Sequence, residues 1–151
     1  MILRVFTDGG SKGNPGPAAI GYIGYVDGQV LFKGREDLGV ATNNAAEYTA
    51  VVRALEKIRE TLKRHSGKPE AHPESDSGQA RMTKVTKIEL SSDSRLLVNQ
   101  VNGLFKVKNG KIKEYILAIR GLELEIGLPI SYINIPREEN TAADDLVNNI
   151  G

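Results

Sequence analysis

The strongest constraint on the fold is a change in the period of the apolar residues near residue 40. Before it, residues 2–7, 18–26 and 29–34 are runs of strand-forming residues, and an Asp-Gly pair between the last two is typical of a hairpin turn. After it, apolar residues recur at steps of three and four, which indicates one face of an amphipathic helix. They are Tyr48, Val51, Val52, Leu55, Ile58 and Leu62. We therefore expect a three-stranded antiparallel meander and then a helix, with the glycine- and proline-rich residues 9–17 forming a loop.

The second half of the chain predicts a strand, two helices, another strand and a final helix. These runs are 85–90, 94–101, 112–126, 129–135 and 140–150. Because the helix after the meander connects two strands, strand 85–90 should lie parallel to strand 2–7, through a right-handed crossover. The order β-β-β-α-β-α-α-β-α predicts an α/β fold, a five-stranded mixed sheet with helices on both faces.

The composition suits one globular domain over residues 1–151. The chain has no cysteine, which excludes disulfides and thiolate metal sites. It has no apolar stretch near the ~20 residues that span a bilayer, and its first residues turn polar too early for a signal peptide. We therefore expect no membrane partner and a cytoplasmic location. The net charge of +1 excludes a globally basic nucleic-acid binder but not a local basic patch.

Residues 65–84 interrupt the alternation of strands and helices. They are polar, contain Pro69 and Pro73, and include both histidines of the chain, His65 and His72. A stretch of this length without an apolar period is unusual inside a compact domain. We interpret it as a mobile surface insertion.

Two of the expected strands are each followed by an aspartate, Asp8 and Asp93. If the two strands are parallel neighbours, these aspartates lie together at the carboxyl edge of the sheet, where α/β proteins bind ligands. Glu47 comes early in the crossover helix, whose packing can bring it to the same edge. Carboxylates gathered so closely need a compensating cation, and an all-oxygen site suits Mg²⁺ or Mn²⁺. The pattern indicates phosphodiester chemistry with divalent cations.

Each acid taken alone has a structural explanation. Asp8 precedes Gly-Gly and can be a turn residue, Asp93 can cap the next helix, and Glu47 can close a capping box. Asp144 and Asp145 can lie in a solvated turn of the final helix. Only their combination favours a metal site.

Four segments resemble, in order and approximate spacing, the motif blocks of type 1 ribonuclease H. They are Thr7-Asp8-Gly9-Gly10-Ser11-Lys12-Gly13-Asn14-Pro15-Gly16-Pro17, Thr42-Asn43-Asn44-Ala45-Ala46-Glu47, Ser92-Asp93-Ser94 and Arg137-Glu138-Glu139-Asn140-Thr141-Ala142-Ala143-Asp144. The first two blocks are specific, and the third is informative only in register with the others. The resemblance spans nearly the whole chain.

The resemblance implies an endonuclease that hydrolyses the RNA strand of RNA–DNA hybrids and leaves 5′-phosphate and 3′-hydroxyl ends. Asp8, Glu47, Asp93 and Asp144 match the four acids that bind two divalent metal ions in that family, with Mg²⁺ as the cofactor and Mn²⁺ as a substitute. The family's Asn-x-x-x-Asp pattern selects Asp144 rather than Asp145 as the fourth ligand. We expect a monomer whose partner is the hybrid.

The resemblance also implies residues that bind the substrate. Ser11, Asn14, Asn43 and Asn44 match polar residues that contact the 2′-hydroxyl, the group that distinguishes RNA from DNA, and Glu47 shares this contact. Turn formation is the alternative explanation for the residues of the first block.

Thr42 and Asn109 resemble the family's pocket for a phosphate of the DNA strand. An arginine usually precedes the threonine there, and this chain has Val40-Ala41 instead, which predicts a weaker pocket. Residues 104–121 carry five basic side chains against one acid, Glu114. This stretch is either a solvated helix face or a patch that follows the nucleic-acid backbone with salt-sensitive binding.

Three features depart from the family pattern. Arg95 stands where the family often has glutamine, so it can contact phosphates or carbonyls instead. The chain has no tryptophan and only Asn-Gly-Leu where many members carry a basic protrusion, which predicts lower affinity. Many members have a histidine shortly before the last aspartate, whereas both histidines here lie in residues 65–84, and Arg137 occupies the comparable loop. Arg137 can stabilise charge or help expel product, but its high pKa excludes it as a general base.

Two alternatives stay open at this point. The same fold and metal site could act on double-stranded RNA or on RNA–DNA junctions. A catalytically inactive hybrid-binding module is the other alternative. The four acids disfavour it, because without metal they would repel a polyanion.

Overall fold

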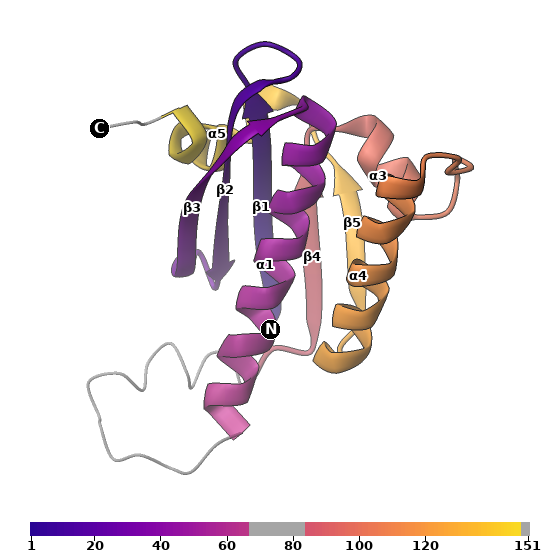
Figure 1. Ribbon diagram of the computed structural model, residues 1–151. Helices are drawn as coiled ribbons and strands as arrows, with labels where there is room; N and C mark the ends of the chain where they lie inside the picture. The colour runs from indigo at the N-terminus through magenta and orange to yellow at the C-terminus, as the bar shows by residue number, and fades with distance from the viewer. Residues whose placement is uncertain (67–83, 149–151) are drawn as a thin grey trace.

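The computed structural model describes residues 1–66 and 84–148 (Figure 1). Its strands and helices follow the predicted order, with a short 3-10 helix added before the last helix. They are β1 (Ile2–Ser11), β2 (Gly16–Val26), β3 (Gln29–Ala41), α1 (Asn43–Ser66), β4 (Lys87–Ser92), α3 (Arg95–Val101), α4 (Gly110–Ile126), β5 (Ile130–Asn134), η1 (Arg137–Glu139) and α5 (Thr141–Asn148). The insertion expected at 65–84 falls mostly on residues outside the described ranges. Within those ranges, no helix has the length and apolar character needed to cross a membrane.

The five strands form one mixed sheet in the order β3-β2-β1-β4-β5. β1, β2 and β3 pair antiparallel, as the meander predicts. β4 lies parallel to β1, and β5 lies parallel to β4. The prediction that the first and fourth strands are parallel neighbours is therefore confirmed, and their carboxyl ends meet at one edge of the sheet.

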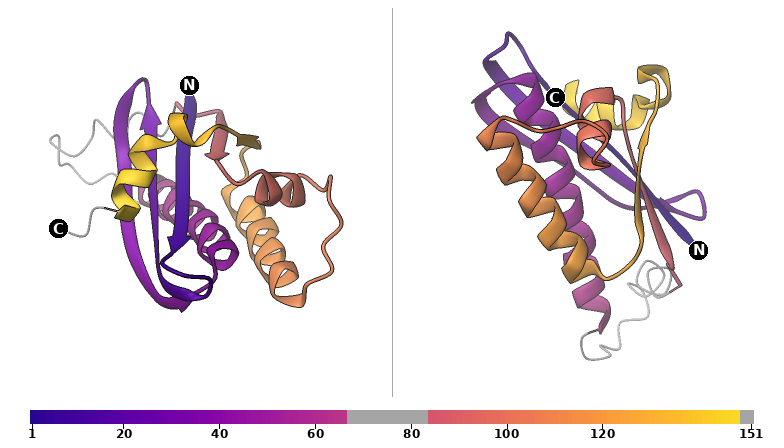
Figure 2. Two further views of the ribbon diagram at one scale, coloured as in Figure 1. Left: turned by 90° about the horizontal axis from the view of Figure 1, so that it is seen from above. Right: turned by 90° about the vertical axis from the view of Figure 1, so that its right-hand side faces the viewer.

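Helices cover both faces of the sheet, as expected. α1 and α4 lie side by side on one face, and α5 packs on the other face against β1 and β2 (Figure 2). The main core lies between α1 and the sheet, where Leu3, Leu55 and Ile88 are fully buried. Tyr48 of α1 stacks on Tyr115 of α4 with their ring centroids 5.4 Å apart. The two helices begin at the same end of the molecule, the end that carries the carboxyl termini of β1 and β4 (Figure 1).

The structure corrects the prediction that residues 9–17 form a loop. β1 continues through both glycines to Ser11, which pairs with Ala18, so the connection to β2 is only residues 12–15. Asp8 therefore lies inside a strand rather than after it. Glycine lowers the strand propensity of this segment, but the partner strand supplies a full ladder of hydrogen bonds.

The third strand is also longer than the predicted 29–34, because β3 reaches Ala41. β2 and β3 stay paired through two register shifts, at Ala18/Ala19 and at Gly24/Tyr25. Each shift breaks the two-residue alternation on which the sequence prediction depends. The extension brings the chain directly to Asn43, where α1 begins.

Gly9 sets how closely α1 approaches β1. A Cβ atom at this position would lie 2.5 Å from the backbone carbonyl carbon and oxygen of Ala46. We expect Gly9→Ala to destabilise the fold by about 3 kcal/mol, since backbone on both sides must shift. It should also lower activity, because Ala46 precedes Glu47. Thermal unfolding and a cleavage assay measure the two effects.

Gly10→Ala is the matched control for this prediction. A Cβ atom at Gly10 would meet nothing within 4 Å among the described residues. It should leave unfolding and activity nearly unchanged. Equal effects of the two substitutions would contradict the role given to the contact between Gly9 and α1.

Candidate active site

Three carboxylates from distant parts of the chain meet at the carboxyl edge of the sheet. Asp8 on β1, Glu47 near the start of α1 and Asp93 after β4 each offer an oxygen, and these oxygens lie within 4.8 Å of one another. The parallel register pairs Thr7 with Ser92, which places the two aspartates side by side. All three side chains are partly exposed at this edge.

The fourth acid, Asp144, approaches the same cluster from α5. Its side chain hydrogen bonds with that of Asp8, and its Oδ1 accepts a hydrogen bond of 3.0 Å from Asn148. Asp145, the next residue, is exposed to solvent. Of these two aspartates, Asp144 is the one in contact with the cluster, and its role as the fourth ligand stays a prediction.

The cluster of acids shifts the pKa of Asp8 strongly. Burial and the neighbouring carboxylates Asp93, Asp144 and Glu47 raise it from 3.8 to about 8. Burial also raises the pKa of Glu47, while a hydrogen bond from Ser94 and the charge of Arg137 oppose that rise. Arg137 in η1 is therefore close enough to act on the charge of the cluster.

The remaining structural explanations of Glu47 and Asp93 are not borne out. The N-cap of α3 is Ser94, whose hydroxyl accepts from the backbone N–H of Leu97, so Asp93 is not the cap. At α1, the hydroxyl of Thr42 caps the helix by accepting from the N–H of Ala45. Glu47 points its carboxylate to the acidic cluster instead.

Two supporting residues were missed by the sequence analysis. Asn140 is 1% exposed, and its Nδ2 donates to the carbonyl oxygen of Thr7 at 2.9 Å and to Asp93 Oδ2 at 3.2 Å. Ser94 contacts Glu47 while it caps α3. Both lie inside the motif blocks, so the signal was present, but neither has a side chain that suggests catalysis by its type.

The donor set fits a hard divalent cation. Carboxylate oxygens are the ligands that Mg²⁺ and Mn²⁺ prefer, and a cation between them would remove the repulsion that raises the pKa of Asp8. The buried Oδ1 of Asn140 also has no hydrogen-bond partner among the described residues. Asp8, Glu47 and Asp93 can therefore hold a metal ion, and Asp144 lies within reach of Asp8.

The polar residues expected to bind substrate form a hydrogen-bonded group beside the acids. Asn43 Oδ1 accepts from the backbone N–H of Ser11 at 2.7 Å and from its hydroxyl at 3.0 Å. Asn14 Oδ1 accepts from the backbone N–H of Asn43 at 3.1 Å. The 12–15 loop is thereby tied to the start of α1, where Asn44 is half-buried.

Thr42 and Asn109 occupy equivalent places at the starts of two parallel helices. Asn109 Oδ1 caps α4 by accepting from the backbone N–H groups of Lys111 and Ile112. Val40, which stands near the position of the family's arginine, is 75% exposed. Arg95 is exposed at the start of α3. The caps explain why Thr42 and Asn109 have these side chains, and their role toward phosphate stays a prediction.

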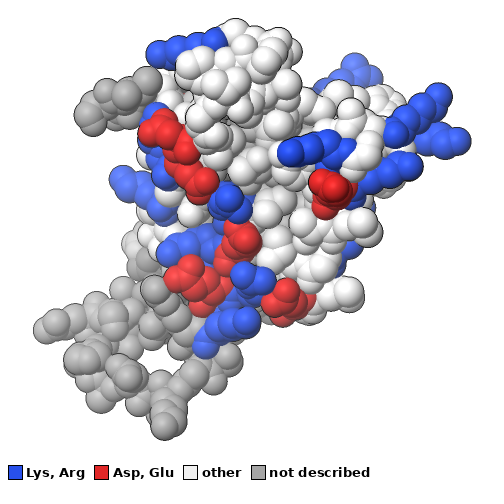
Figure 3. All heavy atoms as spheres, viewed as in Figure 1, with Lys and Arg blue, Asp and Glu red and all other residues white. Residues whose placement is uncertain are grey.

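The basic stretch predicted at residues 104–121 is largely exposed. Lysine and arginine side chains gather near the α3–α4 end of the molecule in Figure 3, whereas α1 mixes both signs of charge. Arg120 is tied into the fold instead, since it contacts Glu123 and the backbone carbonyl of Val101. The other four basic residues, Lys106, Lys108, Lys111 and Lys113, are also exposed and form no ion pair among the described residues.

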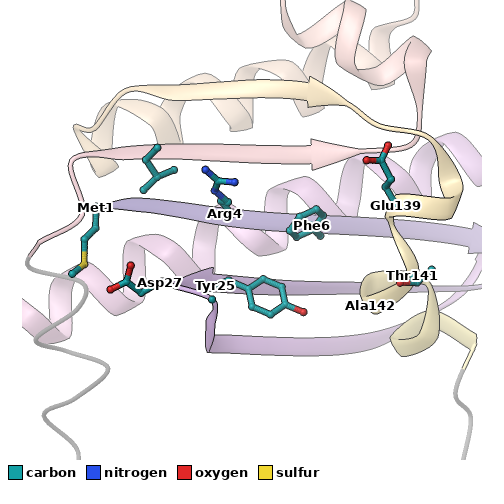
Figure 4. Close-up of a pocket in the computed structure, with 10 residues that line it drawn as sticks. Met1, Arg4, Phe6, Tyr25, Asp27, Glu139, Thr141 and Ala142 are labelled. Atoms are coloured by element: carbon teal, nitrogen blue, oxygen red, sulfur yellow. The ribbon is translucent and has the colours of Figure 1, made fainter.

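A cavity of about 850 Å³ lies away from the acidic cluster. It opens on the part of the sheet face that α5 leaves uncovered, and the rings of Phe6 and Tyr25 meet edge to face on its floor (Figure 4). Its described lining also includes Arg4, Asp27 and Glu139, but none of the four acids. The carboxylate cluster therefore lies outside this cavity.

Comparison with known proteins decides which family this arrangement represents. A family model described as RNase H matches residues 2–117, which include Asp8, Glu47 and Asp93. The chain belongs to the RNase H family. Asp144 lies beyond the matched residues, so its assignment in this RNase H domain depends on the motif and on the contact with Asp8.

Two curated relatives are longer than this RNase H chain. Ribonuclease HI of Halobacterium salinarum is 32% identical over 148 residues, which are 97% of this chain and 62% of the relative. A bifunctional protein of Mycobacterium tuberculosis is 31% identical over 150 residues, 98% of this chain and 35% of that protein. The chain thus spans less than two thirds of the length of either relative.

Solved RNase H structures have the same architecture. The N-terminal RNase H domain of the M. tuberculosis protein superposes with a TM-score of 0.76 at 29% identity, covering 99% of this chain and 98% of that one. LC11-RNase H1, a protein isolated from compost, was solved in complex with an RNA/DNA hybrid. It superposes with a TM-score of 0.77 at 34% identity, covering 97% of this chain and 94% of that chain.

Proposed function

We propose that this protein is an endonuclease that hydrolyses the RNA strand of RNA–DNA hybrids. The observation that carries the proposal is the cluster of Asp8, Glu47 and Asp93 at one edge of the sheet, with Asp144 in contact with Asp8. The similarity to LC11-RNase H1, which binds an RNA/DNA hybrid, supports the choice of substrate.

The four acids are proposed to hold two divalent ions, Mg²⁺ or in its place Mn²⁺. When bound, these ions supply activation of the attacking water and stabilisation of the departing 3′ oxygen, which leaves 5′-phosphate and 3′-hydroxyl ends. The protein's own part is to fix the carboxylates. Asn140 holds Asp93, Ser94 holds Glu47, and Asn148 holds Asp144.

Recognition of RNA is proposed to come from the group formed by Ser11, Asn14 and Asn43. Their mutual hydrogen bonds use the amide oxygens of both asparagines. Within residues 1–66 and 84–148, this leaves the amide NH₂ groups as donors for a 2′-hydroxyl or a base edge in the minor groove. Asn44 extends the same surface along α1, and Thr42, Asn109 and Arg95 are proposed to contact backbone phosphates.

Arg137 is proposed to stabilise negative charge during the reaction. It already opposes the rise in the pKa of Glu47, which places its charge beside the cluster. We expect Arg137→Ala to lower kcat by about 10- to 100-fold with little change in KM, since a charge-assisted contact that forms in the transition state is lost. Steady-state kinetics on a hybrid measure this.

Glu138→Gln, in the same short helix, is the control for Arg137 and should keep normal kinetics. An unchanged kcat for Arg137→Ala would contradict the proposed role. A change confined to KM would assign Arg137 to substrate binding instead.

A comparison of substrates tests the proposed activity. Labelled RNA–DNA hybrid, double-stranded RNA, an RNA–DNA junction and duplex DNA of one sequence are incubated with the protein and Mg²⁺. We expect cleavage of the RNA strand of the hybrid at a rate well above that of the other three. Faster cleavage of double-stranded RNA or of the junction would replace the proposed substrate, and binding of the hybrid without cleavage would indicate an inactive binding module.

A further inference from the structure

A second, smaller cavity of about 250 Å³ lies beside the 12–15 loop, between the end of β3 and the last turn of α5. Its lining includes Ser11, Lys12, Arg35, Asp37, Val147 and Asn148. The volume is several times the ~30 Å³ that one water occupies in the liquid. Ser11 belongs both to this lining and to the polar group beside the acids.

The register of the sheet explains why a guanidinium reaches this place. Asp8, Gly21 and Arg35 stand opposite one another on three adjacent strands, so their side-chain positions share the face that α5 covers. Gly21 has no side chain because α5 packs directly on it, where a Cβ atom would lie 2.8 Å from that of Leu146. Arg35 therefore lies two strands, about 10 Å, from Asp8 along the edge of the sheet.

Arg35 has fewer acceptors than a buried guanidinium normally has. Its Nε and Nη2 atoms are buried, and Nε has no hydrogen-bond partner in the described part of the chain. The acceptor of Nη2 is Asp37, whose Oδ1 lies 2.9 Å away and whose pKa is lowered by this contact, although the Asp37 side chain is 74% exposed. Buried donors without acceptors are rare, and they indicate a missing acceptor.

We propose that Arg35 and Lys12 form a subsite for a phosphate group of the nucleic-acid backbone, next to the carboxylate site. The planar guanidinium offers two donors in the geometry that phosphate oxygens accept, and Lys12 adds a second positive charge. The negative charge of Asp37 offsets these two positive charges, so Asp37 competes with the phosphate for Arg35. That the phosphate belongs to an RNA–DNA hybrid rests on the proposed function. The presence of a phosphate subsite does not.

The first test uses inorganic phosphate as the probe. NMR follows the side-chain Nε–H resonance of Arg35, which Arg35→Gln assigns by removing it. We expect this resonance to shift saturably with phosphate in the wild-type protein. Asp37→Asn should saturate at a several-fold lower phosphate concentration. Lys33→Gln, which changes an exposed lysine on the same strand, should leave the midpoint of the phosphate titration unchanged. A shift that does not saturate would overturn the subsite.

The second test measures hybrid binding in a chelator, over a series of salt concentrations. Arg35→Gln should weaken binding by about 10-fold, as for loss of a charged hydrogen bond. It should also reduce the slope of log K against log salt by about 1, as for loss of one phosphate contact. Asp37→Asn should strengthen binding, and Lys33→Gln should match the wild-type protein.

The two tests separate this inference from the proposed function. If no hybrid is bound or cleaved under any condition, the proposed function fails, and the phosphate titration still decides the subsite. If Arg35→Gln leaves the salt slope unchanged, or if Asp37→Asn weakens phosphate binding, Arg35 and Asp37 are a structural ion pair and the inference is wrong.

Discussion

Asp8→Asn and Asp93→Asn are each expected to lower the rate of RNA cleavage on the order of 10³-fold, because each removes a carboxylate from the proposed metal site. Both side chains lie at the partly exposed edge of the sheet, and asparagine keeps their shape. The fold should therefore persist. Single-turnover cleavage of a labelled hybrid in Mg²⁺, together with circular dichroism, measures activity and fold in the same samples.

Asp144→Asn and Asp145→Asn form a matched pair for the fourth carboxylate. Asp144 hydrogen bonds with Asp8, whereas its neighbour Asp145 is exposed to solvent. We expect a large loss of activity for Asp144→Asn and nearly full activity for Asp145→Asn. The reverse result would show that the fourth ligand is assigned to the wrong residue.

The stability of the metal-free protein is expected to fall as the pH rises from about 4 to about 8. The pKa of Asp8 is about 8 in the folded protein, against an ordinary value of 3.8. Between these values the folded state holds a proton that the unfolded chain has released, so raising the pH favours unfolding. We expect Tm in a chelator to fall by roughly 10 °C between pH 5 and pH 8 from this group.

Two controls isolate the contribution of Asp8. Asp8→Asn should remove most of this pH dependence and should make the metal-free protein more stable than the wild type at pH 8. Mg²⁺ should raise the Tm of the wild type at pH 8, because it binds the folded state. Parallel pH profiles for the wild type and Asp8→Asn would show that the carboxylates do not repel one another as the geometry requires.

The topology could be predicted from the sequence because most of the strands and helices show a clear apolar period of their own. The helix that crosses from the meander to strand β4 fixes the parallel pairing of β1 with β4, and this pairing brings Asp8 to Asp93. Strand ends were harder to predict. Gly9 and Gly10 are typical of a turn, yet they continue β1, because β2 lies alongside and α1 needs the space at Gly9.

The supporting contacts of the site could not be predicted from residue type. Asn140 belongs to a motif block, but its residue type does not indicate that its amide joins the end of β1 to Asp93. The position of Arg35 opposite Gly21 depends on the register of β3, which extends beyond the strand that the sequence predicts. Such contacts join residues far apart in the chain, and periodicity describes only neighbours.

The most direct test of the account is the dependence of RNA cleavage on divalent metal. A hybrid with its RNA strand labelled at the 5′ end is incubated with the wild-type protein in Mg²⁺, in a chelator, and in a chelator followed by excess Mg²⁺. The account predicts fragments with 3′-hydroxyl ends in the first and third samples and intact RNA in the second. Cleavage in the chelator, or no cleavage in any sample, would contradict it.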